Sequence, residues 1–206
     1  MKPLLLLGGG GHCHSAIDVI ESEAQYRIVG VVQPPVDGSE PVLGYPIVGS
    51  DDDLPALLTE TPRALITVGH IKSPTTRRRL FGWLRDHGAE IPVVRSPRAY
   101  CSRRATIGEG SILMHDSLIN ANARIGANCI VNSQALIEHD VGIGDHCHIS
   151  TGARVNGGAL IGTGCFIGSG AVLKEGIEIG DGAIIGAGQV VLRDVEPGKI
   201  VRSHRG

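Results

Sequence analysis

The strongest constraint on the fold is a six-residue repeat that runs without insertion from Thr106 to Val195. In each of its fifteen hexads the second position is aliphatic, and the sixth position is mostly a small residue. A hexapeptide period is typical of a parallel β-helix, in which each hexad forms a short strand and a turn. The repeat therefore predicts a prism of stacked coils with aliphatic side chains in a narrow core.

A longer period within the repeat predicts the cross-section of this prism. The third position of a hexad is glycine at intervals of eighteen residues, at Gly108, Gly126, Gly144, Gly162 and Gly180. Three hexads therefore form one triangular coil, and these glycines stack at one corner, where the backbone turns without room for a Cβ. The same interval separates Cys129, Cys147 and Cys165. We interpret these thiols as small core residues in a reducing compartment.

Length, charge and hydropathy exclude several classes of protein. The chain has 206 residues, enough for one or two domains, and 42% of them are hydrophobic. Its formal net charge of −2 provides no basic surface for nucleic acid or anionic lipid. The apolar run at residues 4–7 is too short for a secretory signal or a membrane-spanning helix. We expect a cytoplasmic protein that binds neither nucleic acid nor membrane.

The segment before the repeat alternates between strand and helix patterns, which is typical of a parallel α/β domain. Strands are expected at residues 4–7, 28–32, 64–68 and 91–94, and helices at residues 14–23, from Ser50 onward and at residues 73–86. Asp37-Gly38 marks a turn, and residues 96–98 resemble a linker. The chain is therefore expected to divide into a Rossmann-like α/β domain at residues 1–98 and an all-β domain at residues 99–206.

A glycine-rich segment, Gly8–His12, joins the first expected strand to the first expected helix. Backbone N–H groups at such a helix N-terminus attract anions. One interpretation is therefore a site for a phosphate or carboxylate of a sugar substrate, and the other is a tight turn without a ligand. The dinucleotide fingerprint G-x-G-x-x-G needs a third glycine where this chain has Cys13 or His14. NAD binding is not expected.

The order of these motifs resembles that of a family of bacterial enzymes. A strand, a G-x-G-G-H segment, a helix, the sequence VGHIKSPTTR at residues 68–77 and a hexapeptide repeat containing I-E-H follow one another. This order is similar to that of the sialic acid O-acetyltransferase family, whose relatives N-acetylate nucleotide-linked 4-amino sugars of the bacillosamine type. The resemblance implies a left-handed parallel β-helix, and a homotrimer that binds acetyl-CoA in the groove between two β-helices. It also implies a sugar or nucleotide-sugar site at Gly10, Gly11 and His12.

The resemblance also implies roles for residues of the repeat. In that family the histidine at the place of His139 deprotonates the acceptor, and Asp140 stands where the neighbouring acid is commonly Glu. A neutral imidazole oriented by a carboxylate is a suitable general base near pH 7. Asn132 matches an asparagine beside the acetyl group, where its amide donates to the thioester oxyanion. The positions that match cofactor contacts are His148, Gly157, Ser169 and Ala187.

The acetyl acceptor is left open by the sequence. Nucleotide-sugar members of the family carry an acidic pair after the second strand, where this chain has Gln33-Pro34-Pro35. The leading prediction is transfer to the amino group of a nucleotide-linked 4-amino sugar in bacterial surface-glycan biosynthesis, and the alternative is O-acetylation of a sialic-acid-like nonulosonic acid. Arg193, Arg202 and Arg205 are either contacts for the CoA phosphates or solvated basic residues.

Two remoter hypotheses are a non-catalytic trimeric scaffold and a metal-dependent β-helix enzyme. The triplets His12-Cys13-His14 and His146-Cys147-His148 each offer two histidines, which are too few for a closed zinc site. The spacing of His115, His139, His146 and His148 also departs from the three-histidine pattern of β-helix carbonic anhydrases. The expected protein is therefore an acetyl-CoA-dependent sugar acetyltransferase without a metal.

Overall fold

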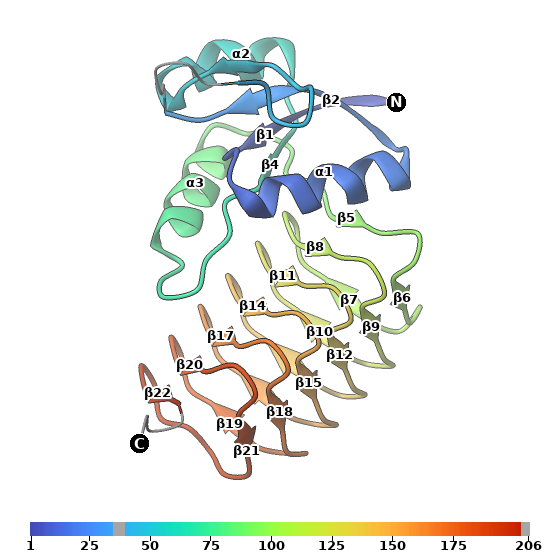
Figure 1. Ribbon diagram of the computed structural model, residues 1–206, viewed down its shortest axis with the longest axis vertical. Helices are drawn as coiled ribbons and strands as arrows, with labels where there is room; N and C mark the ends of the chain where they lie inside the picture. The colour runs from blue at the N-terminus through green and yellow to red at the C-terminus, as the bar shows by residue number, and fades with distance from the viewer. Residues whose placement is uncertain (35–39, 203–206) are drawn as a thin grey trace.

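The structure is a computed structural model that describes residues 1–34 and 40–202. An N-terminal α/β part lies against one side of a long parallel β-helix (Figure 1). The turn expected at Asp37-Gly38 and the basic residue Arg205 lie outside the described residues.

A parallel four-stranded sheet with the strand order β3-β2-β1-β4 forms the centre of the N-terminal part. Its strands are β1 (Lys2–Leu7), β2 (Tyr26–Val32), β3 (Ile47–Gly49) and β4 (Ala64–Ile66). The apolar run of β1 reflects burial on both faces of the sheet. Leu4 and Leu6 pack with helix α1 (Gly11–Glu23). Leu5 and Leu7 pack on the other face, against α2 (Leu54–Glu60) and α3 (Thr75–Asp86).

The elements expected up to residue 86 are confirmed, with one addition. The helix expected from Ser50 begins as a 3₁₀ turn, η1 (Asp51–Asp53), in which Ser50 and Asp53 form a capping box. The short strand β3 was not predicted, because its three residues are only half-buried and carry no alternating pattern.

The repeat forms three parallel sheets that close into triangular coils. The β5 sheet consists of β5 (Val94–Arg95), β8 (Ile112–Leu113), β11 (Ile130–Val131), β14 (His148–Ile149), β17 (Phe166–Ile167), β20 (Ile184–Ile185) and β22 (Ile200–Val201). The β6 sheet consists of β6 (Tyr100–Cys101), β9 (Leu118–Ile119), β12 (Leu136–Ile137), β15 (Arg154–Val155), β18 (Val172–Leu173) and β21 (Val190–Val191). The β7 sheet consists of β7 (Thr106–Ile107), β10 (Arg124–Ile125), β13 (Gly142–Ile143), β16 (Leu160–Ile161) and β19 (Glu178–Ile179).

The eighteen-residue step sets the register between coils, as predicted. Ile125 pairs with Ile107 in the preceding coil and is two strands from Ile161 in the same sheet. The inward aliphatic and small residues form one continuous buried core. The glycine column is also confirmed, because a Cβ on Gly126 would lie 2.6 Å from the backbone nitrogen of Asp145 in the next coil.

The strand expected at residues 91–94 was assigned to the wrong sheet. The observed strand β5 pairs in parallel with β8 of the β-helix and takes no part in the four-stranded sheet. Residues 96–98 are not a free linker, because Ser96 is fully buried and its N–H donates to the carbonyl of Leu113 at 2.9 Å. The division of the chain at residues 98 and 99 stays a prediction.

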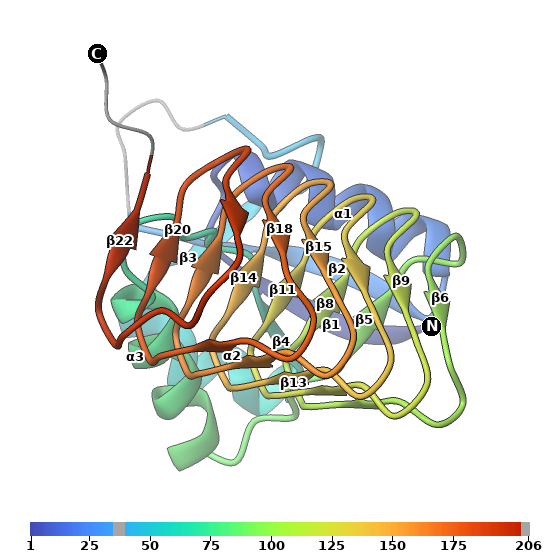
Figure 2. The same ribbon diagram turned by 90° about the horizontal axis from the view of Figure 1, so that it is seen from below.

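The outer faces of the three sheets differ in what covers them. Helix α1 lies across β5, β8 and β11 (Figure 1), where Val94, Ile112 and Ile130 share a core with its buried face. Figure 2 shows the coils from below, with α1 behind them. On the β6 sheet, by contrast, Leu118 and Val190 are 37% and 65% exposed. None of the helices in the described part of the chain is long and apolar enough to cross a membrane.

Candidate active site

The site residues predicted in the repeat fall at two different corners of the prism. The turns from the β5 sheet to the β6 sheet form the β5/β6 corner, which carries Asn132, Ser169 and Ala187. The turns from the β6 sheet to the β7 sheet form the β6/β7 corner, which carries His139, Asp140 and Gly157. His148 lies on β14, in the β5 sheet. Within one chain, the candidate base and the candidate oxyanion donor are therefore on opposite sides of the β6 sheet.

At the β6/β7 corner, His139 and Asp140 form a hydrogen-bonded pair. The Nδ1 atom of His139 lies 2.8 Å from Oδ2 of Asp140, and the two side chains are 64% and 57% exposed. Hydrogen bonds from His139 and from Asn122 lower the pKa of Asp140, so its carboxylate is ionised at neutral pH. An ionised carboxylate accepts only, so Nδ1 carries a proton, and the lone pair of a neutral imidazole in this position lies on Nε2.

Gly157, one coil after His139, leaves room for the imidazole because it has no side chain. A Cβ at residue 157 would lie 2.8 Å from both Cε1 and Nε2 of His139. Real Cβ atoms essentially never approach so closely, so a side chain here would displace the ring. The resemblance implied that Gly157 allows the cofactor to approach. In the structure, the atoms nearest to its missing side chain are those of His139.

A cavity of about 750 Å³ lies where the N-terminal part meets the β5/β6 corner. Its walls are Gly10–His12 with Ser15, the segment Thr67–Lys72, and the side chains of Asn132 and His148. Gly10 and Gly11 face open space, since no atom lies within 4 Å of a Cβ placed on either residue. The first turn of α1 carries no acidic residue, so its free N–H groups can meet an anion. The structure thus brings the predicted substrate-binding residues together with Asn132.

Asn132 and His148 are hydrogen bonded to each other beside this cavity. His148 Nδ1 lies 2.7 Å from the backbone carbonyl of His70, so this nitrogen is the donor. His148 Nε2 then accepts from Nδ2 of Asn132 at 3.2 Å. Because the amide oxygen of Asn132 accepts from the N–H of Ser133 at 2.8 Å, the side chain is held at both ends. One N–H of the Asn132 amide is left to donate to a ligand.

Burial keeps the histidines around the cavity neutral. It lowers the pKa of His12 to about 3, with a smaller contribution from Arg77, and it lowers the pKa of His70 to about 3. The pKa of His148 is lowered to about 4 by the same cause. Among the residues that line the cavity, Lys72 is therefore the cation at neutral pH. The cavity suits a polar ligand that carries a limited negative charge.

Arg77, a fully buried arginine of α3, connects the N-terminal part to the β-helix. Nη1 of Arg77 donates to the carbonyls of Ile66 and Val68 at 2.8 and 2.7 Å. Nη2 donates to the side-chain oxygen of Asn128 at 2.5 Å, and the Asn128 amide donates back to the carbonyl of Arg77 at 3.2 Å. Arg77 is 0% exposed, and both of its Nη atoms donate to protein groups. Its role is therefore to hold α3 against the coils and not to bind a ligand.

Sequence reasoning missed several residues at these places. They are Ser15, Thr67, His70 and Lys72 in the cavity wall, Arg77 and Asn128 beneath it, and Asn122 beside Asp140. A signal was present for four of them. His70, Lys72 and Arg77 lie within the VGHIKSPTTR segment on which the family resemblance partly rests. Asn122 precedes Asp140 by one eighteen-residue coil.

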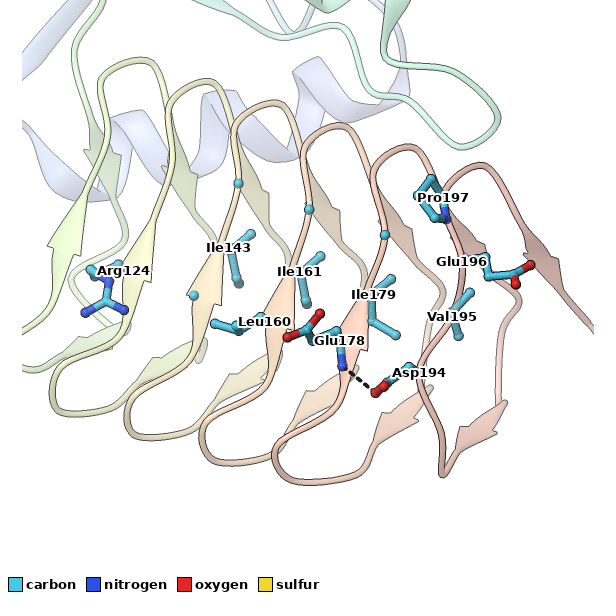
Figure 3. A pocket seen from close by; sticks show the side chains of 14 residues that line it. Arg124, Ile143, Leu160, Ile161, Glu178, Ile179, Asp194, Val195, Glu196 and Pro197 are labelled. Atoms are coloured by element: carbon cyan, nitrogen blue, oxygen red, sulfur yellow. Dashed lines mark hydrogen bonds between the residues drawn. The ribbon is translucent and has the colours of Figure 1, made fainter.

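A second groove lies away from all of these residues, on the outer face of the β7 sheet (Figure 3). Its volume is about 820 Å³, and its charged residues are Arg124, Glu178, Asp194 and Glu196. Asp194 Oδ1 accepts the backbone N–H of Glu178 at 2.9 Å, the bond drawn in Figure 3. This groove has three acidic residues and one basic residue, and it contains none of the predicted site residues.

Two further expectations concern metal and CoA phosphates. Within residues 1–34 and 40–202, no group of three or more His, Cys, Asp or Glu side chains is arranged to hold a metal ion. Of the arginines suggested for CoA, Arg193 and Arg202 are exposed at the C-terminal end of the β-helix.

Comparison with known families divides the chain as the fold does. Residues 3–84 match the family described as PglD N-terminal domain. Residues 140–175 match the bacterial transferase hexapeptide family, and residues 158–193 match the hexapeptide repeat of succinyl-transferase. No curated protein sequence matches the chain.

Solved structures match almost the whole chain. A mutant of perosamine N-acetyltransferase from Caulobacter crescentus, in complex with CoA and GDP-perosamine, is 31% identical with a TM-score of 0.89, and the match covers 97% of this chain and 93% of that one. The acetyltransferase domain of PglB from Neisseria gonorrhoeae FA1090, in complex with acetyl coenzyme A, is 30% identical with a TM-score of 0.86 (97% and 95% covered). WeeI from Acinetobacter baumannii AYE is 26% identical with a TM-score of 0.84 (98% and 97% covered).

These similarities confirm the resemblance drawn from the sequence, together with the fold and the enzyme class that it implied. The chain belongs to the family of sugar N-acetyltransferases that join a PglD N-terminal domain to a left-handed hexapeptide β-helix.

Proposed function

We propose that this enzyme transfers the acetyl group of acetyl-CoA to the amino group of a nucleotide-linked 4-amino sugar, in the cytoplasmic part of surface-glycan biosynthesis. The observation that carries the proposal is the His139–Asp140 pair, which engages Nδ1 of the imidazole and leaves Nε2 free at an exposed corner. The Caulobacter relative, which was solved with CoA and GDP-perosamine, supports the substrate class. O-acetylation of a nonulosonic acid is the alternative.

The reaction needs one base and one oxyanion donor. As the amine nitrogen attacks the thioester carbonyl, Nε2 of His139 takes its proton and Asp140 stabilises the imidazolium. The free N–H of Asn132 donates to the oxyanion of the tetrahedral intermediate. Collapse of that intermediate breaks the carbon–sulfur bond, and the imidazolium returns the proton to the CoA thiolate. The products are the N-acetyl sugar and CoA.

Because His139 and Asn132 lie at different corners of one chain, we infer that two copies complete each site. Three prisms whose β6 sheets face a common three-fold axis bring the β5/β6 corner of one copy beside the β6/β7 corner of the next. The exposed apolar side chains of the β6 sheet support this arrangement, since Tyr100, Leu118 and Val190 are 59%, 37% and 65% exposed. The site is then shared within a homotrimer.

The same arrangement gives both ligands a place. The nucleotide sugar occupies the 750 Å³ cavity, with its phosphates at the N–H groups of Gly10, Gly11 and His12 and its amino group at the open side toward the next copy. Acetyl-CoA lies in the groove between the two β-helices. One wall of that groove is the β5/β6 corner with Ser169 and Ala187, and the other is the β6/β7 corner with Gly157.

The test is CoA release from acetyl-CoA with a panel of acceptors, namely UDP- and GDP-linked 4-amino sugars and free or CMP-linked nonulosonic acids. We expect turnover with a nucleotide-linked amino sugar and a loss of about 10²-fold or more in His139→Ala, since that variant lacks its general base. Turnover with nonulosonic acids alone would establish the O-acetyltransferase. Full activity of His139→Ala would contradict the assignment of the base.

A further inference from the structure

The carboxylate beside His139 is itself held by a residue of the preceding coil. Nδ2 of Asn122 donates to Oδ1 of Asp140 at 3.2 Å, while Oδ2 of the same carboxylate faces Nδ1 of His139. The two residues are one coil apart and occupy equivalent turn positions, each with φ of 61°. One carboxylate oxygen is thus anchored to the scaffold and the other is directed at the imidazole.

An anchor matters here because both partners of the pair are exposed. A side chain that is 57% exposed has several rotamers available in solvent, and only some of them reach the imidazole. The neighbouring acid is held in a similar way, since Asn120 Nδ2 donates to Oε2 of Glu138 at 2.9 Å. That oxygen also accepts the backbone N–H of His139 at 3.3 Å. Each of the two acids that flank His139 is therefore hydrogen bonded to an asparagine of the preceding coil.

We propose that Asn122 is a positioning residue for acetyl transfer, which fixes Asp140 so that His139 keeps the tautomer and orientation of a base. The proposal rests on the proposed function, because it needs His139 to be the base. Asn122 touches neither substrate nor cofactor in this scheme. It acts through Asp140 alone. The groups that act on His139 therefore come from two successive coils of the β6/β7 corner.

The alternative is that asparagine stands at residue 122 only for a structural reason. The backbone there has positive φ, which asparagine tolerates better than most residues. Asn122→Gly separates the two roles, since glycine accepts this conformation and removes only the amide. We expect kcat to fall roughly 3- to 10-fold, the equivalent of one modest hydrogen bond, with the KM for acetyl-CoA unchanged. Ala24→Gly controls for the glycine itself, because Ala24 also has positive φ (55°) and lies at the C-terminal end of α1, away from both corners.

A pH profile distinguishes positioning from a structural role. Asn122→Asp removes one of the two hydrogen bonds that hold the pKa of Asp140 low and places a like charge beside it. The other charged groups near the pair, Glu138 and Arg124, are unchanged. We expect the acidic limb of kcat/KM to move to higher pH in Asn122→Asp. An unmoved limb would contradict the proposal.

A double-mutant cycle completes the test. In an Asp140→Ala background, Asn122→Gly should have no further effect on kcat, because its amide has nothing left to hold. An equal loss in both backgrounds would overturn the inference. So would full activity of Asn122→Gly in an enzyme that His139→Ala inactivates, and that result would leave the proposed function intact. Full activity of His139→Ala would instead refute the proposed function itself.

Discussion

The two corners that flank the β6 sheet hold their polar side chains by opposite means. At the β6/β7 corner, His139 is 64% exposed and is held by hydrogen bonds within the repeat. At the β5/β6 corner, Asn132 lies beside His148, which is 7% exposed beneath the N-terminal part. The first arrangement leaves the imidazole accessible to a neighbouring molecule. The second builds a neutral, preorganised wall for a ligand.

This contrast separates two kinds of variant. The buried junction consists of the side chains that connect the N-terminal part to the β-helix, namely His12, His70, Arg77, Asn128 and His148. Changes at this junction are expected to alter the stability of the protein, because they leave polar groups unpaired away from water. Changes at the exposed corner are expected to alter turnover while the free energy of unfolding stays the same, since exposed side chains contribute little to it.

The largest expected effect is the pH dependence of the junction. Burial lowers the pKa of His12 and His70 to about 3 and that of His148 to about 4, from the ordinary value of 6.5. The unfolded chain therefore binds more protons below pH 6.5, and stability present above that pH is lost as the pH falls. At about pH 5.5 each histidine costs about 1.4 kcal/mol of the free energy of unfolding. Urea unfolding between pH 7.5 and about pH 5 measures this, and a flat profile would contradict it.

A slightly smaller loss is expected from Arg77→Ala at neutral pH. This change leaves the carbonyls of Ile66 and Val68 and the amide of Asn128 without their buried partner. We expect the free energy of unfolding to fall by about 3 kcal/mol. Arg79→Ala is the matched control, because that exposed residue of the same helix forms a surface ion pair with Asp51 and should cost about 1 kcal/mol or less. Equal losses would refute the role of the junction.

Asn132→Ala should affect both properties, because Asn132 belongs to the cavity wall and, in the proposed mechanism, donates to the oxyanion. Removing an oxyanion donor is expected to lower kcat by about 10²-fold. The change also leaves Nε2 of His148 without a donor, which we expect to lower the melting temperature. His139→Ala provides the comparison, with a similar loss of turnover at an unchanged melting temperature. A variant of Asn132 that melts earlier and turns over normally would make this residue purely structural.

The smallest of these effects is expected at Gly157. A methyl group there would meet the imidazole of His139 at 2.8 Å, so the ring must move away from Asp140. We expect Gly157→Ala to lower kcat roughly 10-fold while the KM for acetyl-CoA is unchanged. A raised KM with normal kcat would instead favour the cofactor contact that the resemblance implied. Gly82→Ala is the control, since a Cβ at that position of α3 meets no atom within 4 Å.

The exposed corner was far easier to predict from the sequence than the junction. His139 and Asp140, the proposed base and its acid, are neighbours in the chain, and the eighteen-residue step places each turn above the last. The bonds of the junction join residues 51 and 78 positions apart, Arg77 to Asn128 and His148 to His70. No local pattern encodes such pairs. Strand β5 was misassigned for a related reason, because it precedes the first hexad and shows its pairing only in three dimensions.

Asn122 lies between these two cases. Its contact with Asp140 spans 18 residues, one coil of the repeat, so the period could have predicted it. The hexad pattern predicts which aliphatic residues point inward, and the outward turn residues obey the same eighteen-residue step. A column of turn residues in a β-helix can therefore be searched for pairs that act together.

We propose that each active site combines the β5/β6 corner of one copy with the β6/β7 corner of the next. This shared site is tested by refolding or co-expressing His139→Ala with Asn132→Ala, each of which is expected to be nearly inactive alone. In mixed trimers, a site formed by Asn132 of one variant and His139 of the other is intact. Random mixing of equal amounts then predicts about one quarter of the wild-type kcat. Activity that stays at the level of the separate variants would show that each chain carries its own complete site.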